Sequence, residues 1–393
     1  MVEHRTPPTR GFSPSEFETR VSRAQAIMRR HELDALLLTT PPNIRYVTGF
    51  ATQFWESPTR PWFVVVPADG KPIAVVPEIG ASDMAKTWID DVRSWPAPRP
   101  ADDGTSLLAE ALAQLPRRFG RVGAELGREM ALRMPVIQLD DLRDALPGLE
   151  IANGSPAIWE ARRVKTPAEV EHIRFICQVA SDGYAALPSL VGKGETARDA
   201  CRKLTMEILG RGADAVPFMP GVSGPGGVSQ IVCGPKDDPM AEGDILFIDT
   251  GSFYDGYFCD FDRNYAVGEV ADAAKRAQEA VWDATEAGIA AARPGATVED
   301  VWRVMAKFLE DAGSIGNNVG RMGHGLGMQL TEPPSNMPGD TTPIEPGMVL
   351  TIEPGMEYAP GRMIVHEENV VITEHGAELL TQRAPRGFWR LED

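Results

Sequence analysis

The chain has 393 residues, of which 43% are hydrophobic and 24% are charged, a composition typical of a soluble globular protein with room for two domains. Its formal net charge of -17 argues against nucleic acid or acidic lipid as a partner, because both would be repelled, and leaves small molecules open. The 4 cysteines have no zinc-type spacing, and we find neither a signal-peptide pattern nor an apolar run of about 18 residues. We therefore expect a cytoplasmic protein that does not contact a membrane.

The N-terminal part of the sequence predicts an α/β domain. A helix is expected from Ser13 to Arg30, where apolar residues recur at helical spacing and Ser13 with Glu16 forms a capping-box pattern. Strands are expected at 33–38, within PPNIRYVTGF, in WFVVVP and PIAVVPE and at 121–124, with helices around 79–88 and 105–115. Such alternation of strands and helices is typical of an α/β fold.

The pattern changes around residues 151–167, which predicts one domain over residues 1–160 and a second over residues 161–393. The second part has helical patterns at 167–187, 271–292 and 297–312, and strand patterns in MVLTIEPGM and MIVHEENVVIT. Its glycine-rich segment GVSGPGGVS has no lysine and no strand-then-helix context for a phosphate loop, so we interpret it as backbone turns.

The stretch from Ile245 to Arg263, ILFIDTGSFYDGYFCDFDR, predicts a β-hairpin that carries three aspartates. Asp-Gly at 255–256 is a dipeptide that two-residue hairpin turns prefer. With a two-residue turn, Asp249 lies on the same sheet face as Asp260 and Asp262. Carboxylates gathered on a partly buried face need compensating positive charge, for which a divalent metal is the obvious source. A solvated hairpin with acidic outer positions is the alternative.

Other side chains can complete such a site. His324 lies in GRMGHGLGM, where glycines allow close approach, and Glu353 ends the apolar strand MVLTIE, as Asp249 ends ILFID. Glu367 and Glu368 lie inside an apolar strand, where an acidic residue is costly unless it is coordinated or paired. Alternation along that strand favours Glu367 as the ligand and places Glu368, with a structural His366, on the other side. An oxygen-rich set with one imidazole suits manganese, cobalt, iron(II) or zinc.

With these residues the chain resembles the pita-bread metallopeptidase family, which groups prolidase and aminopeptidase P with creatinase. The family's D-x-G…D-x-x-R aspartates, G-H-G-x-G histidine, E-P-G glutamate and E-D-N-V glutamate fall in order on Asp249, Asp260, His324, Glu353 and Glu367. NIRYVTGF and KTPAEVEHIR are similar to the creatinase/prolidase N-domain and its linker helix. The resemblance implies an α/β N-terminal domain of that type, an α+β pita-bread catalytic domain, and two divalent metal ions on these five residues.

The chain also departs from the family's peptidases, which use two further histidines to hold substrate and stabilise the tetrahedral intermediate. There is no histidine from residue 173 to 323, and the second histidine falls on Thr331. Loss of such donors usually costs a few kcal/mol each, which argues against ordinary peptide hydrolysis and predicts slow turnover of Xaa-Pro dipeptides. Asp262 stands where the family tends to carry threonine, and is either an additional carboxylate of the site or a surface residue. Thr331, Asp262 and Glu353 are our candidate catalytic residues.

The function predicted first is a dinuclear-metal hydrolase of a C–N bond, amide or peptide-like, in a small substrate, Xaa-Pro peptidase-like in architecture. The metals activate a water, and Glu353 takes and returns its proton, as the resemblance implies. A metal-dependent lyase acting on a small carboxylate such as dimethylsulfoniopropionate, and a binding module without activity, are the alternatives.

The loop ATQFWESPTRP combines Phe54, Trp55 and Arg60 with prolines, a mixture of apolar area and positive charge that is enriched at interfaces. Dimeric relatives in the resembling family reach the neighbouring catalytic domain with their N-domains. We therefore predict a homodimer in which Trp55 and Arg60 contact substrate in the partner's site. Alternatively, Trp55 packs inside its own domain.

Overall fold

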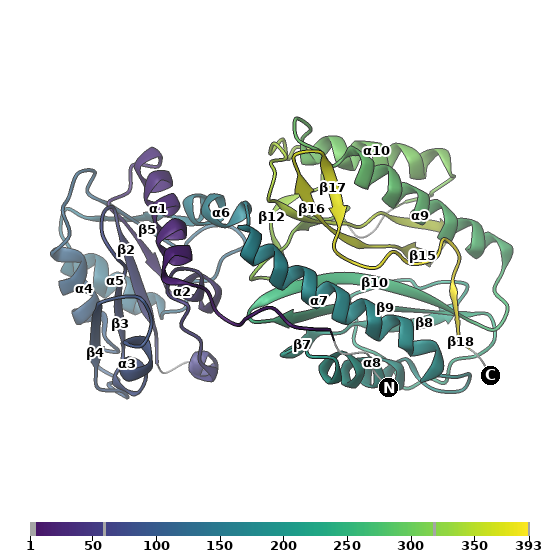
Figure 1. Cartoon of the computed structure of the whole chain (residues 1–393), viewed down its shortest axis with the longest axis horizontal. Coiled ribbons are helices and arrows are strands. Elements are labelled where there is room, and N and C mark those ends of the chain that lie inside the picture. The colour runs from purple at the N-terminus through teal and green to yellow at the C-terminus, as the bar shows by residue number, and fades with distance from the viewer. Residues whose placement is uncertain (1–4, 58–59, 317–319, 392–393) are drawn as a thin grey trace. The chain divides into compact units, whose positions relative to one another are not determined.

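The computed structural model describes residues 5–57, 60–316 and 320–391. Residues 9–162 form one compact unit, and residues from Arg163 onward, together with the segment that precedes Thr9, form the other. The first unit is purple to blue in Figure 1, and the second runs from teal to yellow. No helix in the described ranges is long and apolar enough to cross a membrane.

The first unit is built on a six-stranded sheet with strand order β4-β3-β2-β1-β5-β6. Its strands are β1 (Ala35–Leu38), β2 (Phe63–Pro67), β3 (Ile73–Pro77), β4 (Asp91–Trp95), β5 (Arg121–Ala124) and β6 (Glu150–Asn153). Its helices are α1 (Pro14–Arg30), α2 (Pro41–Thr48), η1 (Gln53–Glu56), α3 (Glu78–Met84), α4 (Thr105–Ala113), α5 (Val136–Ala145) and α6 (Ser155–Arg163). β1 pairs antiparallel with β2 and parallel with β5, so the sheet is mixed.

Strand residues such as Leu37 and Phe63 are buried against Leu108 of α4 and Leu142 of α5. Burial of several such side chains at about 1.5–3 kcal/mol each holds these helices to the sheet. The Ser13 side chain accepts a hydrogen bond from the Glu16 backbone and so caps α1, as the sequence predicts. The predicted α/β organisation is confirmed.

The strand predicted within PPNIRYVTGF is wrong, because residues Pro41–Thr48 form helix α2. The two prolines occupy its first turn, where a missing backbone N–H costs nothing, and Gly49 adopts a φ of 76° as the C-cap. Ile44 and Val47 lie three residues apart on the buried side of the helix, so packing overrides the β preference of this segment.

The second unit contains two five-stranded sheets and a two-stranded one, with strand orders β18-β10-β9-β7 (β8 also pairing with β9), β12-β11-β13-β16-β17 and β14-β15. The strands are β7 (Ala215–Phe218), β8 (Gly221–Pro225), β9 (Asp244–Tyr254), β10 (Tyr257–Val267), β11 (His324–Gly325), β12 (Glu332–Ser335), β13 (Val349–Ile352), β14 (Gly355–Ala359), β15 (Arg362–Val365), β16 (Glu368–Thr373), β17 (Gly376–Leu379) and β18 (Trp389–Leu391). The helices are α7 (Pro167–Ala186), η2 (Leu187–Ser189), α8 (Ala197–Gly210), α9 (Asp272–Ala291) and α10 (Val298–Asp311).

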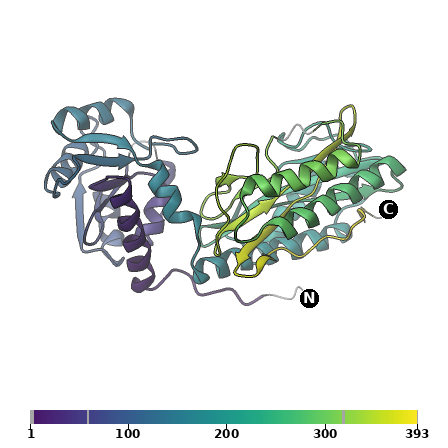
Figure 2. The same ribbon diagram turned by 90° about the horizontal axis from the view of Figure 1, so that it is seen from above.

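Helices α7 and α8 cover one side of these sheets and α9 and α10 cover the other (Figure 1). In the view from above, α9 and α10 run side by side (Figure 2). A core of buried residues that includes Val281, Met305 and Leu350 joins the second helix pair to the strands. Thr166, Thr196 and Thr297 each form a capping box at the start of α7, α8 and α10. This α+β arrangement leaves the long hairpin β9–β10 between the two helix pairs.

Two sequence interpretations of this unit need correction. The glycine-rich segment is not turns alone, because Gly221–Pro225 forms β8, which pairs antiparallel with β9. The stretch MIVHEENVVIT is not one strand but two, since β15 ends at Val365 and β16 begins at Glu368. The interruption falls at His366 and Glu367, which leaves the Glu367 side chain outside the regular ladder.

Candidate metal centre

The hairpin β9–β10 aligns its aspartates on one face, as predicted. Tyr254 pairs with Tyr257 across a two-residue turn in which Asp255 and Gly256 have φ values of 49° and 83°. In this register Asp262 lies directly opposite Asp249, and Asp260 lies opposite Gly251. Residues 249 and 251 share a face because side chains alternate, so all three carboxylates point to the same side.

That face opens into a cavity of about 380 Å³, which we call the carboxylate cavity. Its lining includes all five predicted ligand residues, Asp249, Asp260, His324, Glu353 and Glu367. One ligand atom from each of Asp260, His324 and Glu367 lies within 4.8 Å of the other two. Asp260 on the hairpin, His324 on β11 and Glu367 between β15 and β16 thus meet at one point. The first and the last of them are more than a hundred positions apart in the sequence.

The His324 ring is held in a defined orientation. Its Nδ1 lies 2.8 Å from the Gly325 carbonyl oxygen, which can only accept, so Nδ1 carries the proton. Nε2 is then the available lone pair, and it lies 3.3 Å from Oδ2 of Asp260. The backbone N–H of His324 donates to Thr351 Oγ1 at 3.1 Å, which fixes the residue on β13. A hydrogen bond from the second ring nitrogen to a carbonyl oxygen, like that of Nδ1 here, is typical of metal-binding histidines.

The glycines around His324 permit this close packing. At Gly323, φ is +122°, and an added Cβ would lie 2.1 Å from the Thr351 carbonyl oxygen. At Gly325 an added Cβ would lie 2.6 Å from the Pro333 carbonyl oxygen. Both contacts are with backbone that cannot yield, so only glycine allows β11 to approach its neighbours.

The carboxylates of the cavity are buried close to one another, and Arg321 and His324 offset only part of their charge. Burial, together with repulsion from the neighbouring carboxylates, raises the pKa values of Asp249 and Glu367 well above the usual values of these side chains. Burial likewise raises the pKa of Asp260, and it raises that of Glu353 to about 7 although His324 opposes the shift. Asp249 Oδ1 and Glu367 Oε1 are buried with no hydrogen-bond partner within the described residues. The donor set and its orphaned oxygens fit divalent cations.

The Asp262 carboxylate is buried without hydrogen-bond partners among the described residues, as are oxygens of the candidate ligands Asp249 and Glu367. Both of its carboxylate oxygens are buried without a hydrogen-bond partner in the described parts of the chain. Burial and the neighbouring Asp249 raise its pKa well above the usual range. It does not belong to the described lining of the carboxylate cavity, although it lies directly opposite Asp249 on the hairpin.

Glu368 lies in the opposite environment from its neighbour Glu367. Its carboxylate bonds to Arg263 Nη2 at 3.0 Å and to Arg383 Nη1 at 3.1 Å. Burial alone would raise the pKa of Glu368, but Arg263, His366 and Arg383 together lower it well below its usual value. Burial lowers the pKa of His366 to about 4 although Glu368 opposes the shift, and its Nε2 lies between Arg383 Nη1 and the Glu368 carboxylate. The two glutamates therefore lie in different surroundings, but the separation falls at the break between β15 and β16 and not within one alternating strand.

Two residues whose role the sequence analysis missed hold the backbone beneath the site. Arg263 Nη1 donates to the carbonyl oxygens of Asp262 at 2.7 Å and Glu367 at 2.9 Å. The Asn369 side chain accepts from the Asp260 backbone N–H at 3.0 Å and donates to the carbonyl oxygen of the same residue. For both Arg263 and Asn369, the signal in the sequence that could have indicated this role was a polar residue inside an apolar strand.

Models of known protein families match both parts of the chain. Residues 171–374 match the model of metallopeptidase family M24, and residues 20–164 match that of the creatinase/prolidase N-terminal domain. The chain belongs to metallopeptidase family M24. Its fold is accordingly a creatinase-type N-terminal domain followed by a pita-bread catalytic domain, and it is a metal-dependent hydrolase of the metallopeptidase type. The family is in general dependent on two metal ions.

Several M24 relatives match over nearly the whole chain. A probable dipeptidase PepE of Mycobacterium tuberculosis is 28% identical over 382 residues, which cover 94% of this chain and 95% of the relative. The crystal structure of dipeptidase PepE from Mycobacterium ulcerans is 28% identical with a TM-score of 0.84, covering 97% of this chain and 100% of that one. A prolidase from Thermococcus sibiricus has the same TM-score at 22% identity and the same coverage, which shows the common fold.

Thr331, at the position where the family resemblance implies a histidine, lines the carboxylate cavity together with Arg321. Arg321 Nη2 donates to Thr331 Oγ1 at 3.2 Å, and Nη1 donates to Ser335 Oγ at 3.2 Å. The sequence analysis did not select Arg321. The sequence signal that could have drawn attention to Arg321 was its position, three residues before the candidate ligand His324.

Trp55 and Arg60 lie in the N-terminal unit and line a cavity of about 220 Å³ there. The Trp55 ring lies with its centroid 5.5 Å from that of Phe50 and 5.3 Å from that of Trp62, both in the N-terminal unit. Arg60 lies over the Phe54 ring. Neither Trp55 nor Arg60 belongs to the described lining of the carboxylate cavity, and residues 58–59 of this loop fall outside the described chain.

Proposed function

We propose that this M24 protein hydrolyses the C–N bond of a dipeptide-sized substrate with two divalent metal ions. The observation that carries the proposal is the set of carboxylates in the carboxylate cavity, which are buried and have orphaned oxygens. The residues that would hold the ions, of the manganese, cobalt, iron or zinc type, are Asp249, Asp260, His324, Glu353 and Glu367.

The cavity and the relatives support a small substrate. A volume of about 380 Å³ lies at the lower end of the range for small-molecule sites, enough for a short peptide but not for a folded one. Two of the relatives that cover most of this chain are named dipeptidases.

When bound, the ions would lower the pKa of a water molecule and polarise the scissile carbonyl. The protein's own residues would manage the protons. Glu353 is a buried carboxylate of the cavity, and in the metal-free protein burial raises its pKa to about 7. Glu353 would take the proton of the attacking water and return it to the leaving nitrogen. Asp262, buried opposite Asp249 on the hairpin, would add negative charge that attracts the cations and so strengthen their binding.

Hydrolysis can be told from lyase chemistry by the mass of the products. Purified protein would be analysed for metal, loaded in turn with manganese, cobalt, iron(II) and zinc, and given a dipeptide panel that includes Xaa-Pro substrates. We expect two ions per chain, products that together contain one added water, and Xaa-Pro turnover well below the usual enzyme median of about 10 per second. Two bound ions without cleavage of any peptide would exclude the proposal, and products without added water would restore the lyase alternative.

We also propose a homodimer in which Trp55 and Arg60 contribute to the partner's site. Arg60 could hold a substrate carboxylate bidentately there. Trp55→Ala should then impair turnover while metal content and folding stay unchanged. A fully active monomer at micromolar concentration, or unchanged kinetics in the variant, would remove this idea.

A further inference from the structure

A buried ion pair lies next to the carboxylate cavity, outside the candidate metal ligands. Lys165 Nζ lies 3.1 Å from Glu332 Oε2, and the two side chains are 3% and 1% exposed. Lys165 Nζ also donates to the Arg163 carbonyl oxygen at 3.3 Å. Neither Lys165 nor Glu332 takes part in the proposed chemistry. The solvation lost when two charges are buried often exceeds their attraction, so such a pair calls for a reason other than stability.

The backbone of Lys165 is attached to the start of β13. Its N–H donates to the Gly347 carbonyl oxygen at 2.8 Å, and the preceding residue, Val164, forms a β-bridge with Met348. β13 is the middle strand of the sheet β12-β11-β13-β16-β17. The Lys165 side chain therefore reaches Glu332 from a backbone that is itself fixed to the centre of a sheet.

Glu332 holds the segment that follows β11, residues 326–331. Its Oε1 accepts from the Gln329 backbone N–H at 3.1 Å, while its Oε2 accepts from Lys165. At Gly327 an added Cβ would lie 2.7 Å from Glu332 Oε1 and 2.9 Å from Lys165 Cε. The segment therefore packs directly on the ion pair.

The same segment forms part of the wall of the carboxylate cavity. Leu330 and Thr331 line the cavity, and Thr331 directly precedes Glu332. Leu330 packs over Gly251, where an added Cβ would overlap a methyl group of Leu330. Gly251 lies opposite the candidate ligand Asp260 on the hairpin. A shift of the segment would therefore move two side chains of the wall relative to the metal-binding face.

We propose that Lys165 is a positioning residue that, through Glu332, holds the segment 326–331 in one place. Two side chains of this segment, Leu330 and Thr331, are thereby kept in position against the substrate, and this kinetic consequence rests on the proposed function. A displacement of about 1 Å caused by a residue far from the reacting atoms can lower a rate about a hundredfold. A charged hydrogen bond suits this purpose because it fixes both distance and direction.

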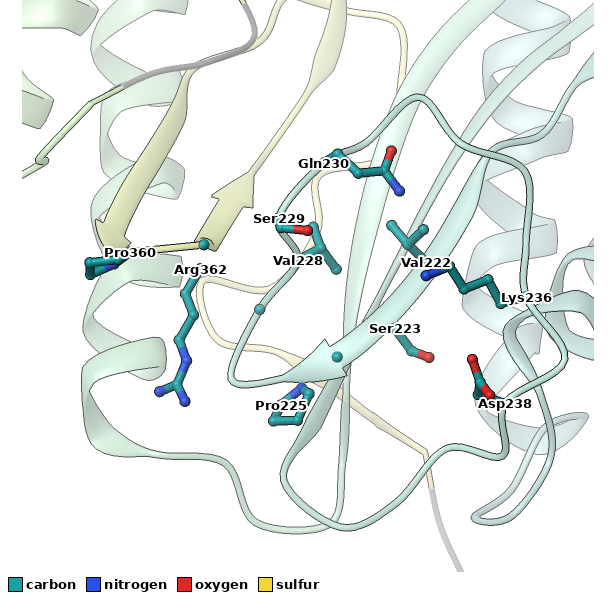
Figure 3. Close-up of a pocket in the computed structure, with 13 residues that line it drawn as sticks. Val222, Ser223, Pro225, Val228, Ser229, Gln230, Lys236, Asp238, Pro360 and Arg362 are labelled. Carbon is teal, nitrogen blue, oxygen red and sulfur yellow. The ribbon is translucent and has the colours of Figure 1, made fainter.

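Lys236 provides a matched control, because it is an exposed lysine near the site, whereas Lys165 is buried. It lines a second cavity of about 330 Å³, which shares Ser229 and Gln230 with the carboxylate cavity. Figure 3 shows Lys236 on the side of this second cavity opposite Arg362. Removal of this lysine changes the charge near the site without touching the segment 326–331.

The experiment removes both charges of the pair together, because removal of one would leave the other buried and uncompensated. The apolar double variant, Lys165→Met with Glu332→Leu, should keep the metal content and nearly the Tm of the wild type. Its kcat for a dipeptide should fall about tenfold or more, with KM changed less than kcat, because the metal ligands are intact while the wall has moved. Lys236→Met should keep the wild-type kcat.

A conservative version separates loss of position from loss of charge. The amide double variant, Lys165→Met with Glu332→Gln, is also uncharged at the pair, but its glutamine oxygen can still accept from the Gln329 N–H. It should therefore recover part of the kcat that the apolar double variant loses. A pair that contributes charge alone would leave the two double variants equally impaired.

Hydrogen exchange at Phe258 gives a readout that needs no turnover. The Phe258 backbone N–H, on β10, donates to the Gly327 carbonyl oxygen at 2.8 Å, so it reports the position of the segment through a bond that neither substituted side chain makes. In metal-loaded protein we expect exchange about tenfold or more faster in the apolar double variant than in the wild type, and unchanged in Lys236→Met. Faster exchange in a protein that cleaves no peptide would sustain the positioning role and exclude the proposed function.

Four outcomes would overturn the inference. Wild-type exchange at Phe258 in the apolar double variant would show that the segment is held without the pair. Faster exchange with wild-type kcat would show that the position of the segment does not matter for turnover. A fall in kcat that accompanies loss of metal or of Tm would assign the pair to the stability of the whole unit. An equal fall in Lys236→Met would show that any positive charge near the site has this effect.

Discussion

Glu367 and Glu368 are neighbours in the sequence, both are buried, and their charges are compensated in different ways. Around Glu368, Arg263, His366 and Arg383 outweigh burial and lower the pKa of the carboxyl well below its usual value. Around Glu367, burial and four further carboxylates raise the pKa. The residues around Glu368 therefore form an ionic network in which the charges compensate one another. The carboxylates around Glu367 can all be ionised only when cations are bound among them.

The difference shows how a buried charge can be assigned a role. A carboxylate whose partners are arginines contributes to the fold, and its loss leaves those cations unpaired. A carboxylate whose neighbours are other carboxylates is a candidate ligand. The two networks touch through Arg263, which bonds the side chain of Glu368 and the backbone of Glu367.

The largest effect is expected from removal of a residue on the metal side. Asp260→Ala or His324→Ala should abolish metal retention and reduce activity to background, because each removes a ligand and leaves the remaining charges uncompensated. Circular dichroism should show that the fold largely survives. Unchanged metal content and activity after either substitution would show that the five-residue site is wrong.

A matched pair of substitutions separates the two networks. Glu367→Gln should lose metal, whereas Glu368→Gln should retain metal but lower the free energy of unfolding by about 3–5 kcal/mol, because Arg263 and Arg383 are left without their anion. Metal analysis and denaturant unfolding of the metal-loaded proteins measure both. Loss of metal in Glu368→Gln but not in Glu367→Gln would reverse the assignment.

The metal side should also make the stability of the metal-free protein depend on pH. Glu353 has a folded pKa of about 7 against an ordinary value of 4.5, so its contribution to stability is fully present below pH 4.5 and is lost as pH rises through 7. Asp249, Asp260 and Glu367 shift in the same direction. The Tm of chelator-treated protein should therefore fall between pH about 5 and about 8. Metal-loaded protein should not show this fall, and parallel curves for the two forms would contradict it.

The smallest effect is expected at Arg383, the less buried of the two arginines around Glu368. Arg383→Gln should lower the free energy of unfolding by about 1.5–3 kcal/mol, the usual contribution of a hydrogen bond to a charged group, because Arg263 still compensates Glu368. Metal content should stay at the wild-type level. A larger loss than in Glu368→Gln would show that Arg383, and not Arg263, is the principal partner.

Much of the site could be predicted from local sequence because its rules are local. The Asp255-Gly256 turn sets the register of the hairpin, and strand alternation then decides which carboxylates share a face. Alternation along one strand does not describe Glu367 and Glu368, because they separate at the break between β15 and β16. Local rules failed at residues 41–48, where β-forming residues between two prolines and a glycine form helix α2. There the burial of Ile44 and Val47 outweighs propensity, and burial is a property of the whole domain.

The sequence by itself determined the identity of the candidate ligands, the hairpin face that carries three aspartates and the family resemblance. Only the tertiary structure decided that His324, Glu353 and Glu367 meet that face in one cavity, because contacts between segments so far apart depend on the packing of the sheets. Only the tertiary structure placed Arg321 at the wall of that cavity and turned Glu368 towards Arg263 and Arg383. The physical reason is that the role of a charged side chain is set by its neighbours in space, whereas the sequence specifies only its neighbours along the chain.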